Sequence, residues 1–281
     1  MTAKPRTALI TGASSGIGLE MARLLARDDV RLALSAKDKE RLERAARWIL
    51  GECPGATIVT IPADLARAGT AAGLFERAES EIGPIDLLIN NAGVGIAGPF
   101  SEADEQKAID LLQLNITALV VLTRRALPVM IARREGRILN VASTAAYLPG
   151  PRMALYYASK AFVLSFGEAV AEEVRGTGIS VTTLCPGPVP TGFQERAGIE
   201  SAGLLRGPLS QPATEVARAG ITGALAGRRV VVPGLANKAS VALMRLVPRR
   251  CLALLAQKAH APRRAPASGL KQPDDIAPPE V

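Results

Sequence analysis

The sequence has few of the side chains that most often build metal centres and nucleophilic active sites. Its 281 residues include one histidine, His260, and three cysteines, Cys53, Cys185 and Cys251. The cysteines are far apart and form no C-x-x-C pair, so neither a zinc site nor a disulfide framework is expected. A Ser-His-Asp triad needs a histidine beside its nucleophile, whereas His260 stands in a polar stretch near the end of the sequence. We therefore expect no bound metal and no catalytic triad.

Long hydrophobic runs are also missing. No uncharged stretch reaches the roughly 18 residues that a transmembrane helix needs. Residues 1–6 are polar, and the apolar run at 7–11 is too short for a signal peptide. Scattered cysteines are typical of a reducing compartment. The sequence therefore predicts a cytoplasmic protein.

Acidic residues are absent from one long segment, between Glu215 and Asp274. That segment holds eleven of the 34 basic residues, which leaves 23 basic against 26 acidic residues in the rest of the chain. The net charge of +8 therefore belongs to the C-terminal quarter. Aromatic residues that could stack on bases are nearly absent there, so nucleic-acid binding is not predicted. The eleven are Arg218, Arg228, Arg229, Lys238, Arg245, Arg249, Arg250, Lys258, Arg263, Arg264 and Lys271.

The rest of the composition is typical of a globular α/β protein. Apolar residues make up 48% of the chain and charged residues 21%, which is enough for a sizeable core. Short, nearly continuous apolar runs alternate with longer segments in which apolar residues recur every three or four positions. This alternation indicates a doubly wound parallel sheet of about seven strands, covered on both faces by helices. The predicted strands are residues 6–11, 30–35, 57–61, 85–90, 137–142, 180–184 and 229–232.

We divide the chain into one domain, residues 1–233, and an appendage. Residues 234–261 predict an appended amphipathic basic helix, interrupted near Pro248. From residue 262 to 281 proline recurs with few apolar residues, which predicts a disordered tail. A basic amphipathic helix suits an anionic membrane surface. We favour the alternative, in which the helix packs on the domain or on a second subunit.

A glycine-rich turn, T-G-A-S-S-G-I-G at residues 11–18, follows the first predicted strand and leads into a helical pattern. Glycine adopts backbone angles closed to other residues, and the N-terminus of a helix supplies free N–H groups for a pyrophosphate. The spacing differs from the usual G-x-G-x-x-G, so a tight structural turn is the alternative. We predict dinucleotide binding here, through Gly12, Ser14, Ser15, Gly16, Ile17 and Gly18.

Tyr156 and Lys160 are four residues apart in a predicted helix and share one of its faces. A phenol with a pKa of about 10 is a poor acid–base group at neutral pH. A nearby ammonium lowers that pKa, which suits a proton donor to a carbonyl. Taken alone, the pair also fits an ordinary aromatic beside a solvated lysine. Tyr157 points about 100° away on the helix and is not expected to take part.

Three further polar residues lie where a ligand would meet the predicted sheet. Ser143 follows the fifth predicted strand and Asn91 the fourth, at the edge where open α/β sheets bind ligands. Ordinary turn residues are the alternative for both. Asn115 falls inside an apolar helical segment. It is either a satisfied core amide or part of a polar network.

Together these residues resemble the short-chain dehydrogenase/reductase family. The resemblance covers residues 6 to about 233 and adds Pro186 and Gly187, followed by Thr191. It implies a Rossmann-type fold, with hydride transfer between a nicotinamide cofactor and a carbonyl or alcohol carbon. The basic C-terminal helix is similar to one in a bacterial branch of the family.

The resemblance also implies a role for each matching residue. Tyr156 would be the general acid or base, and Lys160 would lower its pKa and bind the nicotinamide ribose. Ser143 would bind the substrate oxygen, and Asn115 would hold a water in a proton relay. The family's cofactor contacts fall on the glycine turn, Asn91, Tyr156, Lys160, Pro186, Gly187 and Thr191.

The end of the second predicted strand favours NADP over NAD. By resemblance, Ala36 occupies the position at which NAD-dependent members carry aspartate. Lys37 follows, where many NADP-dependent members have arginine. Asp64 resembles the family's adenine-contacting acid, and a helix N-cap is its alternative role.

These features predict a homo-oligomeric, NADP-preferring oxidoreductase for a small or apolar carbonyl or alcohol substrate, with NAD as the alternative cofactor. A 3-oxoacyl reductase is the alternative activity. A nucleotide-sensing or scaffold protein without turnover is the alternative from another class. The presence of Ser143, Tyr156 and Lys160 argues against that last reading, because a pure binding protein does not need them.

Overall fold

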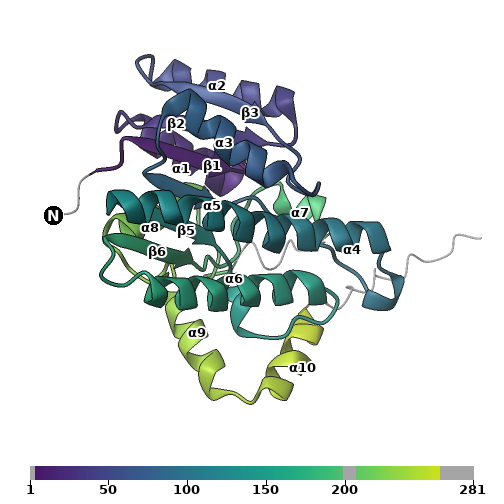
Figure 1. Cartoon of the computed structure of the whole chain (residues 1–281). Coiled ribbons are helices and arrows are strands. Elements are labelled where there is room, and N and C mark those ends of the chain that lie inside the picture. The colour runs from purple at the N-terminus through teal and green to yellow at the C-terminus, as the bar shows by residue number, and fades with distance from the viewer. Residues whose placement is uncertain (1–3, 199–206, 260–281) are drawn as a thin grey trace, which may run out of the picture.

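Seven parallel strands form one sheet in the order β3-β2-β1-β4-β5-β6-β7 (Figure 1). The computed structural model describes residues 4–198 and 207–259, so the predicted tail at 262–281 lies outside the described residues. Each strand lies within two residues of its predicted bounds, and the predicted fold class is confirmed. The strands are β1 (Thr7–Thr11), β2 (Arg31–Ala36), β3 (Ile58–Pro62), β4 (Leu87–Asn90), β5 (Gly136–Val141), β6 (Ile179–Leu184) and β7 (Val230–Val231).

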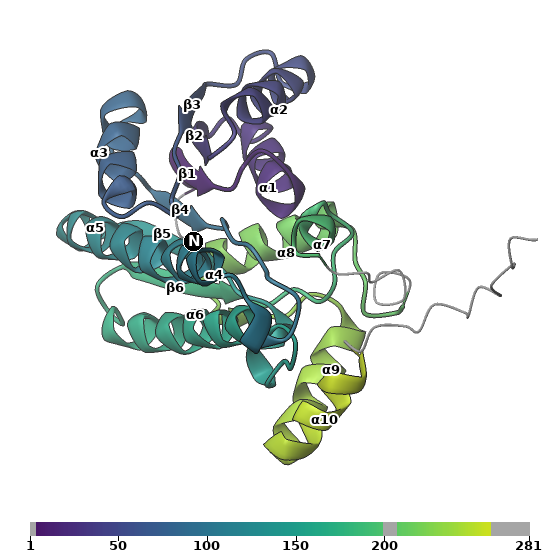
Figure 2. The same ribbon diagram turned by 90° about the vertical axis from the view of Figure 1, so that its right-hand side faces the viewer.

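Helices cover both faces of the sheet (Figure 2). All five residues of β1 are buried, which is why the strands read as continuous apolar runs. One face carries α1 (Gly16–Ala26), α2 (Lys39–Glu52) and α8 (Ala213–Leu225). The other carries α3 (Thr70–Ile82), α5 (Ala118–Arg133) and α6 (Ala154–Glu173). Two short helices, η1 (Phe100–Glu102) and α7 (Phe193–Arg196), lie in the loops.

One long helix combines α4 (Glu105–Leu112), a π-helical turn η2 (Gln113–Thr117) and α5. Within the described residues, it is the helix that is long and apolar enough to cross a membrane. Its buried side chains, among them Leu122 and Met130, pack in the core with those of α3. On its outer side Arg125 pairs with Glu76 at 2.9 Å. We therefore interpret it as a core helix of the domain.

β1 lies between β2 and β4. The strand order therefore runs outward from β1 in both directions, through β2 and β3 on one side and through β4 to β7 on the other. Leu9 of β1, for example, is paired with Ala33 of β2 and with Leu88 of β4. A crevice forms outside the carboxyl ends of the strands at such a reversal, and ligands bind there in open α/β sheets. The glycine turn after β1 and residues 90–93 after β4 flank this crevice.

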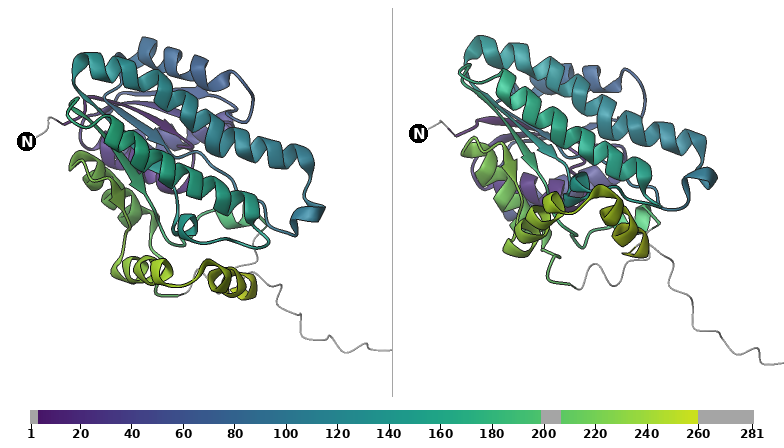
Figure 3. Two further views of the ribbon diagram at one scale, coloured as in Figure 1. Left: turned by 60° about the horizontal axis from the view of Figure 1, so that its bottom comes forward. Right: turned by 90° about the horizontal axis from the view of Figure 1, so that it is seen from below.

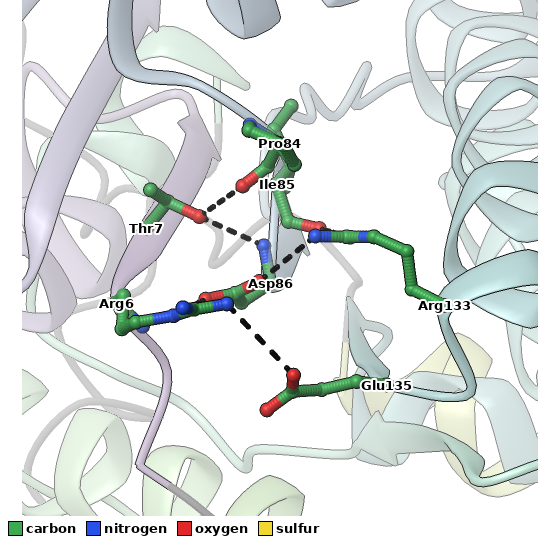
Figure 4. Close-up of polar contacts among 7 residues, drawn as sticks. All are labelled: Arg6, Thr7, Pro84, Ile85, Asp86, Arg133 and Glu135. Carbon is green, nitrogen blue, oxygen red and sulfur yellow. Dashed lines mark hydrogen bonds and ion pairs between the residues drawn. The ribbon is translucent and has the colours of Figure 1, made fainter.

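The opposite edge of the sheet is held together around a buried carboxylate (Figure 4). Asp86 accepts a hydrogen bond from the backbone N–H of Arg6 at 2.9 Å, and Arg133 Nη1 lies 3.1 Å from its other oxygen. Arg133 also donates to the carbonyl of Ile85 at 2.7 Å, and the Asp86 N–H donates to the Thr7 hydroxyl at 2.9 Å. These contacts connect β1, β4 and the end of α5, on the side of the sheet away from the crevice.

The described chain ends in two helices, α9 (Leu235–Leu246) and α10 (Arg249–Ala259), which meet at Pro248 as the sequence predicts. They form a V beside α6 and are seen from below in Figure 3. We call residues 234–259 the C-terminal arm. Val241 of α9 is buried, and the guanidinium of Arg245 lies 5.4 Å from the centre of the Tyr147 ring. The arm packs on the domain with one face, as we expected.

Candidate active site

A cleft of about 780 Å³ follows the carboxyl edge of the sheet. It begins at Lys37 and Arg41, passes the glycine turn and Tyr156, and ends among residues of the C-terminal arm. Nearly all the residues that the sequence analysis assigned to the site line this cleft. The exceptions are Gly18 and Asn115, which lie behind its wall.

Two glycines with positive φ angles and the side chain of Asn91 determine the shape of the glycine turn. Gly12 and Gly16 have φ angles of +66° and +58°, a region that residues with side chains rarely adopt. Asn91 Nδ2 donates to the carbonyls of Thr11 at 2.9 Å and Gly12 at 3.1 Å. A Cβ at Gly18 would lie 2.4 Å from Asn91 Nδ2, so Gly18 is needed for close packing behind the turn. Asn91 therefore holds the turn as well as lining the cleft.

The start of α1 fits the phosphates of a dinucleotide. The Ser15 side chain makes no capping hydrogen bond, and the first turn of α1 carries no acidic residue. Thr191 packs closely against Gly16 at the start of α1. A Cβ added at Gly16 would lie only 3.0 Å from Thr191 Cγ2. Free N–H groups at a helix start beside close glycine backbone bind a pyrophosphate well. The turn and the extended cleft beside it therefore fit a nicotinamide dinucleotide.

Ser143, Tyr156 and Lys160 meet in the middle of the cleft. Ser143 follows β5, accepts a hydrogen bond from the Ala145 N–H at 3.1 Å and lies beside Tyr156, whose pKa it acts to lower. Tyr156 lies in the first turn of α6, and Lys160 follows one turn later. The Lys160 ammonium lies 5.8 Å from the centre of the Tyr156 ring. A substrate oxygen can thus meet two hydroxyl groups with a cation behind them.

Burial shifts the pKa values of Tyr156 and Lys160. It raises the pKa of Tyr156 to about 12, although the hydrogen bond with Ser143 acts to lower it. It lowers the pKa of Lys160 to about 8. Lys160 Nζ donates to the carbonyl of Val141 at 2.8 Å, and its expected lowering of the Tyr156 pKa stays a prediction. With the pKa raised by burial, Tyr156 is a neutral phenol at pH 7.

Asn115 holds the backbone beside Lys160. It lies in the π-helical turn η2, a distortion that is frequent at functional sites. Its amide donates to the Val94 carbonyl at 2.9 Å and to Ser159 Oγ at 3.0 Å, and accepts from the Val94 N–H at 2.9 Å. A Cβ at Gly93 would lie 3.3 Å from both Asn115 Oδ1 and Lys160 Nζ. This pattern is that of a satisfied buried amide, and the relay water remains a prediction.

Lys37 and Asp64, the residues predicted for the adenosine end, form an ion pair at 3.0 Å. Burial acts to raise the pKa of Asp64, but hydrogen bonds from Lys37 and the Ala66 N–H outweigh it and hold that pKa below its ordinary value. The Lys37 side chain is 76% exposed. Exposed ion pairs contribute at most about 1 kcal/mol. A phosphate could therefore replace Asp64 as the partner of Lys37 with little loss of free energy.

Sequence reasoning missed a second cation at this end, Arg41. It lines the cleft from the first turn of α2, and its guanidinium makes no ion pair within residues 4–198 and 207–259. Asp38, the acidic neighbour, caps α2 by accepting from the Arg41 N–H at 2.9 Å. The available signal was a basic residue at the start of the helix that follows the second predicted strand. Lys37 and Arg41 together could hold a phosphate.

The loop after β6 is packed against the C-terminal arm. A Cβ at Gly187 would lie 2.4 Å from Asn237 Oδ1 of α9. Asn237 is buried, and its Nδ2 lies 3.1 Å from each of three acceptors, Leu209 O, Gln211 Oε1 and Pro233 O. Sequence analysis treated the arm as an appendage and missed this residue. The signal was a polar residue on the otherwise apolar side of α9.

The far end of the cleft is apolar and surrounds the substrate side of Tyr156. The Phe193 ring lies 5.2 Å from the Tyr156 ring. Apart from Lys160, the basic lining residues are at the other end of the cleft, and Asp110 is the acidic residue near this one. The apolar lining includes Leu148, Met153, Phe193, Leu209, Met244 and Leu255. Such a wall suits an uncharged substrate.

Comparisons with known proteins agree with this geometry. A family model described as short chain dehydrogenase matches residues 6–201. The ketoacyl reductase HetN of Nostoc sp. is 34% identical over 66% of this chain, a match that covers 63% of HetN, less than two thirds of its length.

Two solved structures share the fold. A short-chain dehydrogenase from Sphingobium yanoikuyae in complex with NADPH is 32% identical, with a TM-score of 0.75, over 86% of this chain and 96% of that one. A short chain dehydrogenase/reductase from Burkholderia phymatum in complex with NAD is 27% identical, with a TM-score of 0.77, over 86% and 94%.

Proposed function

This chain belongs to the short chain dehydrogenase family, an NAD(P)-dependent class of oxidoreductases, and on that premise we propose that it is an NADP-preferring carbonyl reductase or alcohol dehydrogenase for small or apolar substrates. One observation carries the proposal. Ser143, Tyr156 and Lys160 together line a cleft that continues from the glycine turn. A protein that only senses nucleotides would not need these three residues there.

In the proposed reaction Tyr156 donates its proton to the carbonyl oxygen during reduction and takes a proton back during oxidation. Ser143 hydrogen-bonds the same oxygen and orients the phenol. The Lys160 charge favours the phenolate that remains when the proton leaves. A bound nicotinamide supplies or accepts the hydride. We place Asn115 as a positioning residue, which holds residues 93–94 and any relay water beside Lys160.

We assign the preference for NADP to Lys37 and Arg41 acting together at the end of β2. Both line the cleft there, and Ala36 presents no carboxylate that would repel a 2′-phosphate. The Sphingobium yanoikuyae relative, in complex with NADPH, supports NADP as the cofactor, and the Burkholderia phymatum relative, in complex with NAD, keeps NAD as the alternative.

A substrate screen tests the proposed activity. The full chain, supplied with NADPH, should reduce uncharged apolar ketones faster than matched ketones that carry a carboxylate. The reasons are the apolar lining around Phe193 and Met244 and the lack of a basic partner at that end among the residues that the structure describes. NADPH binding without turnover of any carbonyl in the panel would contradict the proposal and favour a nucleotide-sensing role.

A 3-oxoacyl reductase is the second candidate, because HetN is described as a ketoacyl reductase. The same assay separates the two. A 3-oxoacyl thioester turned over far more efficiently than a simple ketone of equal chain length would favour the second candidate.

We also propose that the protein is a cytoplasmic homo-oligomer. Large apolar side chains are exposed along α4, α5 and α6, namely Ile109, Leu112, Val129, Ile131 and Phe162. Exposed apolar clusters mark contact surfaces. Light scattering on the purified chain would show a mass above that of one chain if these helices meet those of a second copy.

A further inference from the structure

The C-terminal arm has an outer face that the domain leaves uncovered. On α9 the buried residues Asn237 and Val241 define the inner side. Leu235 and Leu246 point the opposite way and are each 83% exposed. They lie on the stripe Leu235, Ala239, Ala242 and Leu246, whose spacing of four, three and four residues follows one face of a helix.

α10 repeats the arrangement. Leu252 and Ala256 are buried, whereas Leu254 is 61% exposed on the other side. Leu243, near the end of α9, is 63% exposed as well. Monomeric proteins rarely expose so many leucines in so short a segment. The outer face of the arm therefore has the composition of a contact surface.

Basic residues surround these leucines. Lys238, Arg249 and Arg250 are exposed, and none of the three makes an ion pair within the part of the chain that the structure describes. Arg245 is exposed too, with its guanidinium over Tyr147. The sequence has no acidic residue between positions 216 and 273. Nothing within the arm neutralises its positive charge.

A second copy of this chain is a poor partner for that face. A two-fold contact through this face would bring the cationic patch of one copy, Lys238, Arg249 and Arg250, to the same patch of the other copy. Like charges without acidic partners oppose such a contact. An anionic bilayer surface, by contrast, attracts the cations and accepts leucines among its acyl chains.

We propose that the outer face of the C-terminal arm docks the protein on an anionic lipid surface. Its leucines, Leu235, Leu243, Leu246 and Leu254, enter the interface, and its cations meet lipid headgroups. Leu255, which is exposed and also lines the cleft, places the substrate end of the cleft next to that surface. This proposal does not depend on the proposed reaction.

Sedimentation with vesicles tests it. The full chain should bind vesicles made of equal parts phosphatidylcholine and phosphatidylglycerol, and should bind pure phosphatidylcholine vesicles much more weakly. Replacing Lys238, Arg249 and Arg250 together by Gln should weaken binding about a hundredfold, because each basic residue near an anionic surface contributes about fivefold. Raising the salt concentration should weaken it as well.

The leucines need a separate variant with a matched control. Replacing Leu235, Leu246 and Leu254 by Ser should weaken vesicle binding by about tenfold or more. Phe100→Ser removes a side chain that is 65% exposed on η1, outside residues 234–259, and should leave binding unchanged. NADPH binding and circular dichroism, measured on every variant, report whether the domain is still folded.

Three outcomes would overturn the proposal. The first is binding that does not depend on phosphatidylglycerol, and the second is binding that survives both triple substitutions. The third is an absence of vesicle binding combined with a smaller assembly in the leucine variant, which would assign the face to contact between copies.

Discussion

The hydroxyl of Tyr156 is the atom on which the proposed reaction depends. Tyr156 lies beside Ser143 and Lys160 and lines the cleft at its apolar end. Replacing Tyr156 by Phe keeps the ring and its packing against Phe193 but removes the proton donor. We expect kcat for carbonyl reduction to fall about 10²–10⁴-fold, with NADPH affinity retained, as measured by steady-state kinetics and fluorescence titration.

Tyr147→Phe makes the same chemical change outside the cleft. Tyr147 lies at the end of the short helix η3 (Thr144–Tyr147) with its hydroxyl 3.9 Å from Cys185 Sγ, and the loss of this hydroxyl should leave kcat nearly unchanged. Appreciable turnover by the Tyr156 variant, or an equal loss in both variants, would remove Tyr156 from its role.

The two shifted pKa values predict opposite pH profiles for the two reaction directions. With a pKa of about 12, Tyr156 stays protonated and can donate during reduction. Lys160, with a pKa of about 8, loses its charge above that pH. We expect kcat/KM for reduction to be level below pH 8 and to fall above it, and oxidation to rise as the phenol deprotonates. A rate of reduction that climbs through pH 8 would contradict the assignment.

In the proposed site, Arg41 contributes to the preference for NADP as much as Lys37 does. Arg41→Ala removes a guanidinium that can hydrogen-bond a phosphate, an interaction of about 1.5–3 kcal/mol with a charged group. NADPH affinity should therefore fall more than tenfold, and NADH affinity should change little. Arg44→Ala is the matched control, because Arg44 lies on the same helix and outside the cleft. Equal losses for the two cofactors would show that the 2′-phosphate is recognised elsewhere.

At the scale of elements, α9 is part of the active-site framework. Asn237→Ala leaves three acceptors around the loop after β6 without their donor, at a cost of about 1–3 kcal/mol for a buried group left unpaired. We expect a lower Tm and a higher KM for NADPH, because Gly187 packs against this side chain. Lys238→Ala, at the exposed neighbouring position, should change neither. An unchanged KM in the Asn237 variant would make α9 a passive appendage.

The sequence predicts individual elements well where one local rule decides them. Apolar strand runs placed all seven strands, and Tyr156 and Lys160 share a helix face because four residues make about one turn. Contacts between distant segments could not be predicted in this way. The ion pair of Lys37 with Asp64 and the packing of Asn237 on Gly187 depend on the sheet order and on the path of the arm. The raised pKa of Tyr156 also could not be predicted locally, because burial, its largest cause, depends on how the cleft is packed.

At the scale of the whole molecule, the edge at the amino ends of the strands contributes to stability and the edge at their carboxyl ends forms the cleft. The amino edge carries the stabilising network around Asp86 (Figure 4). The carboxyl edge carries the cleft. Asp86→Ala leaves Arg133 without its buried partner, which costs about 3–5 kcal/mol. We expect a clearly lower Tm in thermal unfolding, with kcat per folded molecule unchanged. A loss of kcat at temperatures where the variant is fully folded would mean that the two edges are coupled.

The central claim is that the cleft is a working nicotinamide site with a preference for NADP. Titration of the purified chain with NADPH and with NADH, followed by nicotinamide fluorescence, tests it most directly. We predict saturable binding of both, with NADPH the tighter ligand because Lys37 and Arg41 meet its additional phosphate. Tighter binding of NADH would contradict the preference. Binding of neither would contradict the claim itself, since the glycine turn would then be a structural turn without a cofactor.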